Sequence, residues 1–140
     1  MKILAAVDGS PFTKRMLEYL SAHDIWLGPQ HDFTVLHSVP AVPPRAARMV
    51  DAATLQGYYE EEAEKVFKPL RSFFKRSGVE PTFVSKVGSA ADNIARTADK
   101  GNFDLVVMGS HGHGRLANLV LGSTASSVVA QCGVPVLLIR

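Results

Sequence analysis

The sequence has very little cysteine, since Cys132 is the single one in 140 residues. One cysteine excludes an internal disulfide and a multi-cysteine metal site and favours a reducing compartment, so we expect a cytoplasmic protein. The apolar N-terminal stretch meets Asp8 too early to form a signal peptide or a membrane span. Runs of Lys and Arg are also missing and the formal net charge is only +2, so we expect neither nucleic acid nor membrane as a partner.

What is present fits one globular domain over residues 1–140. Hydrophobic residues make up 46% and charged residues 20%, which argues against extended disorder. Five short apolar runs alternate with helical patterns, at residues 3–7, 33–39, 82–87, 105–108 and 134–139. Strands that alternate with helices predict an α/β fold with a parallel sheet. The runs 3–7 and 105–108 are apolar at every position, as central strands covered on both faces should be.

The predicted helices span residues 10–28, 51–77, 89–101 and 123–133. Ser10, Ser89 and Ser123 stand where a hydroxyl can cap the first amides of a helix. Cys132 falls on the apolar face of the last helix and is expected to be a small core residue. In the second helix Pro69 removes one backbone hydrogen bond, so we expect a kink at residues 65–69.

Two further segments carry expectations about partners. Residues 40–50 hold three prolines and two arginines and are predicted to form a mobile loop. The last strand, residues 134–139, contains Pro135, which places it at a sheet edge. A hydrophobic edge needs cover, so we expect a homodimer through residues 134–139. The alternative is that loops of the same chain cover this edge.

A glycine-rich segment, residues 109–124, joins the strand 105–108 to the last helix. In open α/β sheets ligands bind at the carboxyl ends of strands, and glycines let the backbone approach a phosphate closely. The helix start adds free amides, the positive end of its dipole and the hydroxyls of Ser123 and Thr124. The segment has neither the P-loop nor the Rossmann glycine spacing, yet it predicts a phosphate site.

The spacing of these glycines resembles the nucleotide motif of the universal stress protein family. Both gaps of that family's pattern, Gly-x2-Gly-x9-Gly-Ser/Thr, are met by Gly109, Gly112, Gly122 and Ser123. The similarity also covers residues 7–10, 35–37 and 134–139. It implies a single-domain open five-stranded parallel sheet of order 3-2-1-4-5 with helices on both faces, Rossmann-like and of the adenine nucleotide alpha hydrolase type.

The resemblance further implies that an adenine nucleotide, ATP or else ADP or AMP, lies across the ends of the first and fourth strands. The residues that match its contacts are Ala6, Val7, Asp8, Ser38, Gly109, Gly112, Gly122, Ser123 and Thr124. Asp8 is expected to bind the ribose or a Mg²⁺ ion held by the phosphates, with capping of the turn at Gly9 and Ser10 as the alternative. Ser38 replaces a valine that usually contacts adenine through its main chain, and such a contact tolerates the change.

Other residues in or near this segment also carry expectations. Gly114 continues the glycine series, and His111 and His113 fit a phosphate contact better than a metal site because no third ligand lies nearby in the sequence. Arg115 is expected either to pair with the terminal phosphates or to point into solvent. His37, at the end of an apolar strand, is expected to be a hydrogen-bonded core histidine.

The sequence therefore predicts an adenine-nucleotide-binding stress-response or signalling module that presents residues 40–50 to an unidentified protein partner. No nucleophile with an adjacent base and no paired carboxylates are evident, so we do not expect an enzyme, and any hydrolysis should be slow. One alternative is a slow Mg²⁺-dependent ATPase or nucleotide-dependent transferase, with Asp8 holding the metal and His111 or His113 carrying a proton. Another is a dimeric interaction module that binds no nucleotide, which the intact glycine spacing disfavours.

Overall fold

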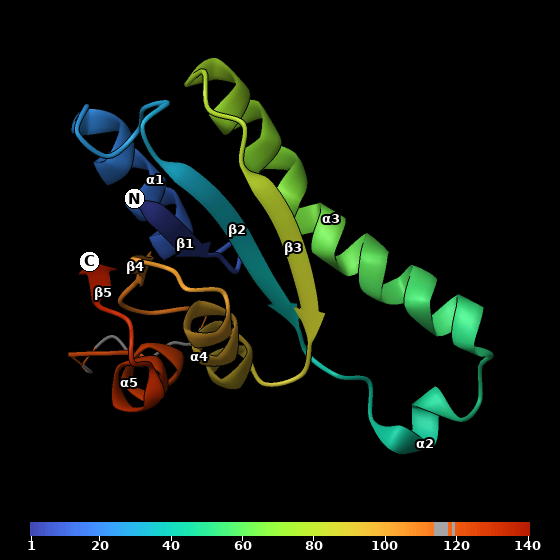
Figure 1. Ribbon diagram of the computed structural model, residues 1–140. Coiled ribbons are helices and arrows are strands. Elements are labelled where there is room, and N and C mark those ends of the chain that lie inside the picture. The colour runs from blue at the N-terminus through green and yellow to red at the C-terminus, as the bar shows by residue number, and fades with distance from the viewer. Residues whose placement is uncertain (114–117, 119) are drawn as a thin grey trace.

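Five parallel strands form one sheet in the order β3-β2-β1-β4-β5, the order that the resemblance implied (Figure 1). The structure is a computed structural model that describes residues 1–113, 118 and 120–140. The strands are β1 (Lys2–Ala6), β2 (Asp32–Val39), β3 (Thr82–Val87), β4 (Leu105–Gly109) and β5 (Val136–Ile139). The prediction that the runs 3–7 and 105–108 form central strands is confirmed, since β1 and β4 pair with each other inside the sheet.

Helices cover both faces of this sheet. They are α1 (Pro11–Ala22), α2 (Pro44–Ala47), α3 (Ala52–Arg76), α4 (Ala90–Lys100) and α5 (Ser123–Gln131). Successive side chains of a strand point to opposite faces, and along β1 Ile3 and Ala5 belong to the core under α1 and α3. Leu4 and Ala6 belong to the second core, under α4 and α5. A strand buried on both faces has to be apolar where it is covered, as residues 3–6 of β1 are.

Two of the three predicted serine caps are confirmed. The hydroxyl of Ser10 accepts a hydrogen bond from the amide of Thr13, and the hydroxyl of Ser89 accepts one from the amide of Asp92. The prediction for Ser123 is wrong, because Gly122 occupies the N-cap of α5 and Ser123 is the first helical residue. The Ser123 hydroxyl is therefore not used to cap its own helix.

Other predicted boundaries also differ from the structure. The first helix ends at Ala22, well before Gly28. The long helix α3, by contrast, has the predicted extent and includes Pro69, and the kink expected at residues 65–69 stays a prediction. Residues 40–50 are not a plain loop, since they contain the one-turn helix α2, which has a proline in its first turn where the missing amide costs no helix bond.

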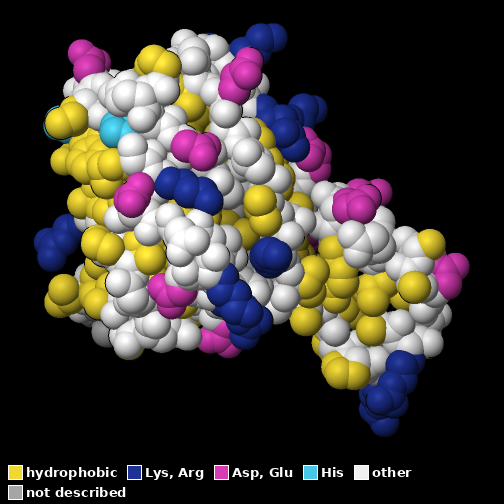
Figure 2. Space-filling view, viewed as in Figure 1, with side chains coloured by type: hydrophobic (Ala, Val, Ile, Leu, Met, Phe, Trp, Pro, Cys, Tyr) yellow, Lys and Arg dark blue, Asp and Glu magenta, His cyan; other side chains and the backbone are white. Residues whose placement is uncertain are grey.

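The segment from α2 to the N-terminal half of α3 projects beyond the end of the sheet, and we refer to residues 40–60 as the arm (Figure 1). Figure 2 shows hydrophobic side chains gathered over it and basic side chains at its tip. The exposed large hydrophobic residues of the arm are Met49, Val50 and Tyr58. The amide of Val42 donates to the hydroxyl of Tyr59 at 2.9 Å and so ties the start of the arm to α3. Among the described helices, none is long and apolar enough to cross a bilayer.

The strand β5 lies at one edge of the sheet, as predicted. It begins at Val136, after Pro135, whose carbonyl accepts a hydrogen bond from the amide of Val106. The proline thus precedes the strand proper, and β5 pairs with β4 through residues 136–139. Its other edge carries no partner strand within the described chain, so the predicted homodimer through this strand stays a prediction.

Candidate functional site

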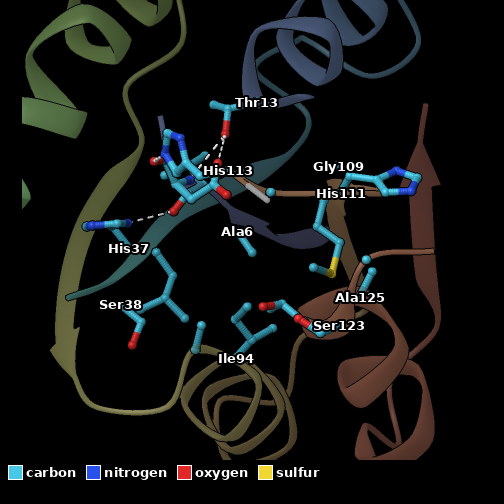
Figure 3. A pocket seen from close by; sticks show the side chains of 18 residues that line it. Ala6, Thr13, His37, Ser38, Ile94, Gly109, His111, His113, Ser123 and Ala125 are labelled. Atoms are coloured by element: carbon cyan, nitrogen blue, oxygen red, sulfur yellow. Dashed lines mark hydrogen bonds between the residues drawn. The ribbon is translucent and has the colours of Figure 1, made fainter. Parts of the chain in front are cut away.

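A pocket of about 200 Å³ opens at the carboxyl ends of β1 and β4, next to the start of α5 (Figure 3). The strand β1 lies between β2 and β4, so the chain connections diverge at this point of the sheet. In open α/β sheets such a switch point is where ligands bind. Of the predicted contact residues, ten line the pocket: Ala6, Val7, Asp8, Ser38, Gly109, Gly112, His113, Gly122, Ser123 and Thr124. Gly114 and Arg115 lie outside the described residues.

Asp8 holds the turn that follows β1. One carboxylate oxygen, Oδ1, accepts hydrogen bonds from the Ser10 amide and the Thr13 hydroxyl, each at 2.9 Å. Gly9 between them has φ +73°, a left-handed conformation that glycine adopts without strain. The oxygen Oδ1 thus caps the turn at Gly9 and Ser10, as the alternative interpretation of Asp8 expected. The second oxygen, Oδ2, faces Gly112 across the pocket, where a Cβ atom would come within 2.7 Å of it.

The glycine-rich segment packs against its surroundings more closely than a side chain would allow. A Cβ atom at Gly109 would lie 2.7 Å from Cβ of Phe12 on α1, and one at Gly122 would lie 3.0 Å from Cα of His111. The amide of Gly122 also donates to the carbonyl of Ser110 at 2.7 Å. Glycine at these positions therefore allows the segment to pack tightly against α1 and against its own backbone. From the sequence alone, phosphate contact was the only reason found for these glycines.

Three histidines line the pocket, and two of them have a definite hydrogen-bonding state. The His37 Nδ1 lies 2.8 Å from the carbonyl of Val7, and the His113 Nε2 lies 2.6 Å from the carbonyl of Asp8. Because a carbonyl only accepts, both nitrogens carry a proton. His37 is buried and hydrogen-bonded, as predicted. The third, His111, has its Nδ1 2.8 Å from the buried hydroxyl of Ser110.

These histidines do not gather into a metal site. Across residues 1–113, 118 and 120–140, no three His, Cys, Asp or Glu side chains are grouped so that they could hold a metal ion. The rings are instead held by main-chain carbonyls and neighbouring rings, with the Phe12 and His111 centroids 4.9 Å apart.

The first turn of α5 forms one end of the pocket, and we call it the phosphate end, with Gly112, Ser123 and Thr124. The first amides of a helix have no partner within the helix, and the helix dipole places partial positive charge there. Ser123 and Thr124 both line the pocket, and Ser123 is exposed. This end offers amide and hydroxyl donors to an anion.

The opposite end, which we call the base end, is formed by Leu36 and Ser38 of β2 together with Ala90 and Ile94 of α4. Of these residues, only Ser38 was predicted to contact the ligand. Ala90 and Ile94 are four residues apart and lie on one face of a helix that Ser89 caps just after β3. The helical pattern could therefore have predicted that these two side chains lie together near the strand ends. Their apolar side chains provide a surface on which a flat aromatic group can lie.

The main chain of Ser38 faces this end of the pocket. In a parallel sheet alternate residues direct their N–H and C=O groups to the same neighbouring strand. Leu36 pairs with Ala6, and its carbonyl accepts from the amide of Val7 at 2.9 Å. Two residues later, Ser38 directs its N–H and C=O to the same side, where the pairing with β1 has ended. A donor and an acceptor thus stand side by side at the pocket wall.

Comparison with known proteins gives one family. The model of the universal stress protein family matches residues 1–140. A universal stress protein of Thermus aquaticus is 33% identical over 140 residues, which cover 99% of this chain and 97% of that protein. The universal stress protein Slr1230 of Synechocystis is 30% identical over 140 residues. That alignment covers 99% of this chain but 42% of the Synechocystis protein, which is much longer.

Solved structures share the fold. The universal stress protein UspA of Lactobacillus plantarum superposes with a TM-score of 0.79 at 24% identity, over 100% of this chain and 97% of that one. A universal stress protein in complex with cAMP gives 0.73 at 19% identity, over 100% and 97%. One from Archaeoglobus fulgidus in complex with dAMP gives 0.68 at 22% identity, over 100% and 98%. With the family model matched over its whole length, this chain belongs to the universal stress protein family.

Proposed function

We propose that this protein binds an adenine nucleotide in the pocket at the ends of β1 and β4 and serves as a stress-response or signalling module. The observation that carries the proposal is the pair of main-chain groups at Ser38, which face the base end of the pocket beside the apolar side chains of Ala90 and Ile94. The phosphate end supplies donors at the opposite side. One pocket therefore offers a surface for a base and a cradle for phosphates.

The donor and acceptor at Ser38 suit adenine better than guanine. Adenine presents an acceptor, N1, beside an amino donor at N6, whereas guanine presents a donor, N1–H, beside an acceptor, O6. The N–H of Ser38 would donate to N1 and its C=O would accept from N6. The cAMP and dAMP complexes of family structures support an adenine nucleotide as the ligand. Within this class we propose ATP, with ADP and AMP as the competing ligands.

We propose binding without rapid turnover. In the described part of the site, His113 donates to the Asp8 carbonyl, and Oδ1 of Asp8 is engaged by Ser10 and Thr13. Oδ2 of Asp8 could supply one ligand to a Mg²⁺ ion carried in by the phosphates, since Mg²⁺ on nucleotides usually takes one or two protein carboxylates. We expect ATP hydrolysis far below one turnover per second, a rate that is already low for an enzyme. A slow Mg²⁺-dependent ATPase or transferase would be recognised by faster turnover of labelled ATP.

The proposal includes assembly and signalling. The free edge of β5 is the proposed contact of a homodimer, because two such edges can satisfy each other's hydrogen bonds. Ser38 lies two residues before the arm, so a base bound at Ser38 would act directly on the strand end from which the arm departs. Sedimentation at micromolar concentration tests the dimer, and a monomer would contradict it.

Two measurements test the binding proposal. Mass spectrometry of the small molecules released from freshly purified, unfolded protein should recover an adenine nucleotide near one per chain. Calorimetric titration of the emptied protein should show ATP binding tighter than GTP. The variant Ser123→Glu adds a negative charge at the phosphate end and should weaken ATP binding at least about fivefold. Ser127→Glu, exposed and further along α5 but not in the pocket, is the matched control. ATP binding that Ser123→Glu leaves unchanged would reject the site.

A further inference from the structure

The arm, residues 40–60, exposes large apolar side chains to solvent. Met49 is 86% exposed, and Val50 and Tyr58 are 44% and 46% exposed. Single exposed hydrophobic residues are normal on a protein surface, but these three belong to one projecting segment. Figure 2 shows hydrophobic side chains gathered over that segment. A group of this kind marks a surface for contact with another molecule.

The arm keeps a defined shape although it projects from the sheet. Near its base, the amide of Val42 donates to the hydroxyl of Tyr59 at 2.9 Å, which holds the outgoing segment beside α3. At its tip, the carboxylate of Asp51 accepts from the amide of Thr54 at 2.7 Å and caps the start of α3. Because these bonds order the arm beforehand, a complementary surface can bind it with little loss of conformational entropy.

The two ends of the arm carry opposite charge. Arg45 and Arg48 lie at the tip, and Glu60 and Glu61 lie on α3 at the base; all four are exposed. Figure 2 shows hydrophobic side chains between basic ones at the tip and acidic ones nearer the body of the molecule. Within the part of the chain that the structure describes, none of the four takes part in an ion pair.

The acidic residues that follow on α3 are, by contrast, paired within the chain. Glu62 lies 2.7 Å from the Lys65 ammonium, and Glu64 lies 3.1 Å from the Arg71 guanidinium. At the tip the Asp51 carboxylate is engaged in its cap, and two arginines against one aspartate leave the tip basic. Charge without an ionic partner therefore remains at both ends of the arm, with opposite signs.

We infer that the arm binds the arm of a second copy of this chain, laid antiparallel to it about a two-fold axis. In such a contact the basic tip of each arm meets the acidic base of the other. The same arrangement brings Met49 and Val50 of one arm to Tyr58 of its partner, which removes all three from water. A standard interface uses about 20–30 residues a side, which residues 40–61 supply. The contact involves neither the nucleotide pocket nor β5, so it goes beyond the proposed function.

A second arm fits these charges better than a lipid surface does. An anionic membrane would attract Arg45 and Arg48 at the tip. It would also repel Glu60 and Glu61, and it offers their charge no partner. A second arm satisfies both ends at once, and its own apolar side chains cover those of the first.

Charge reversal in the full-length protein tests this pairing. Arg45→Glu/Arg48→Glu makes both ends of the arm acidic, and Glu60→Arg/Glu61→Arg makes both ends basic. Each contact occurs twice across the axis, so either variant should pair with itself at least about tenfold more weakly than the parent protein. A mixture of the two variants restores opposite charges at every contact. Mixed pairs should therefore form about as tightly as pairs of the parent protein.

Native mass spectrometry of the mixture separates the arm from the edge of β5. Both variants leave β5 unchanged, so a contact through β5 would combine them in statistical proportion, whereas arm pairing gives an excess of mixed assemblies. Arg96→Glu/Lys100→Glu, exposed on α4 and equal in charge change, is the matched control and should associate like the parent protein. Met49→Ser should weaken association about fivefold or more, with an unchanged circular dichroism spectrum because Met49 is outside the core.

Mixed assemblies in statistical proportion, or association that charge reversal leaves unchanged, would overturn the inference. It would also be overturned if Arg45→Glu/Arg48→Glu abolished binding to phosphatidylserine vesicles and left association unchanged, because the partner would then be a membrane. Calorimetric titration with ATP keeps the inference apart from the proposed function. Arm pairing in a protein that binds no ATP would reject that function and support the inference, and ATP binding without arm pairing would do the reverse.

Discussion

The two ends of the pocket are constructed differently. The base end consists of regular elements, the strand β2 and the helix α4, whose residues Leu36 and Ile94 are also core residues. The phosphate end consists of a turn and a loop in which glycines permit contacts that no other residue would allow. The base end is shaped by packing that the fold requires in any case. The phosphate end depends on a few close backbone approaches, so substitutions there should act on the ligand and the loop together.

The largest difference between the two ends should appear in a ligand series of ATP, AMP and adenosine. Ser123→Glu places a charge beside the phosphates, and two unit charges about 4 Å apart repel by about 1–4 kcal/mol, or about fivefold to roughly a thousandfold in affinity. The loss should be largest for ATP and absent for adenosine. Ile94→Ala removes contact with the base and should weaken all three ligands equally. Calorimetric titration gives both series, and equal losses for ATP and adenosine in Ser123→Glu would contradict the assignment of the two ends.

Substitutions at two glycines, one in the pocket and one outside it, test the role of close packing. At Gly109 a Cβ atom would meet Phe12 at 2.7 Å, so Gly109→Val should lower the free energy of unfolding by about 1–3 kcal/mol through overpacking. At Gly57 in α3 a Cβ atom would meet nothing within 4 Å, and Gly57→Ala should raise it by about 1 kcal/mol through helix propensity. Urea denaturation measures both. A Gly109→Val protein as stable as the parent would mean that close packing does not explain this glycine.

Thr13→Val probes how rigidly the turn at Asp8, beside the phosphate end, is held. The buried Thr13 hydroxyl accepts from the Asp8 amide at 3.1 Å and donates to Asp8 Oδ1 at 2.9 Å. Valine has the same shape and no hydroxyl, so the free energy of unfolding should fall by about 1 kcal/mol. Nucleotide affinity should fall only a fewfold, with the ATP preference over GTP unchanged because the base end is not touched. A changed preference would show that the two ends are coupled.

The smallest effect concerns Cys132, at the opposite end of α5 from Ser123. Burial raises the pKa of its thiol, with a smaller contribution from the nearby Asp99 carboxylate. A raised pKa means less thiolate at a given pH, so a thiol reagent at pH 8 should label the folded protein more slowly than the unfolded one. Saturating ATP should leave the rate unchanged, because the ligand lies at the other end of the helix. Ellman's reagent measures both rates.

Much of the fold could be predicted because it depends on patterns local in the sequence. The apolar runs of β1 and β4 and the caps at Ser10 and Ser89 each follow from a few neighbouring residues. The end of α1 and the cap of α5 were harder, because several turn formers stand near each boundary and tertiary contacts choose among them. The N-cap of α5 is Gly122, whose amide donates a hydrogen bond to the Ser110 carbonyl.

The site was predicted where a motif marked it and missed where distant segments meet. The glycine spacing identified the phosphate end, yet the physical reason for the glycines, contact with Phe12, Asp8 and His111, depends on tertiary structure. The wall formed by Ala90 and Ile94 requires knowing that α4 crosses the end of β2. The bond from Asn93 to Ser38 joins residues 55 positions apart, and no local pattern announces it.

The hydrogen bond between the Gly122 amide and the Ser110 carbonyl has a consequence for protein engineering. It brings together the two ends of the connection from β4 to α5, so the fold does not depend on how many residues lie between them. Each doubling of the length of a connection costs only about 0.6 kcal/mol of closure entropy. A peptide tag inserted at Asn118, which is exposed, should therefore leave the sheet intact.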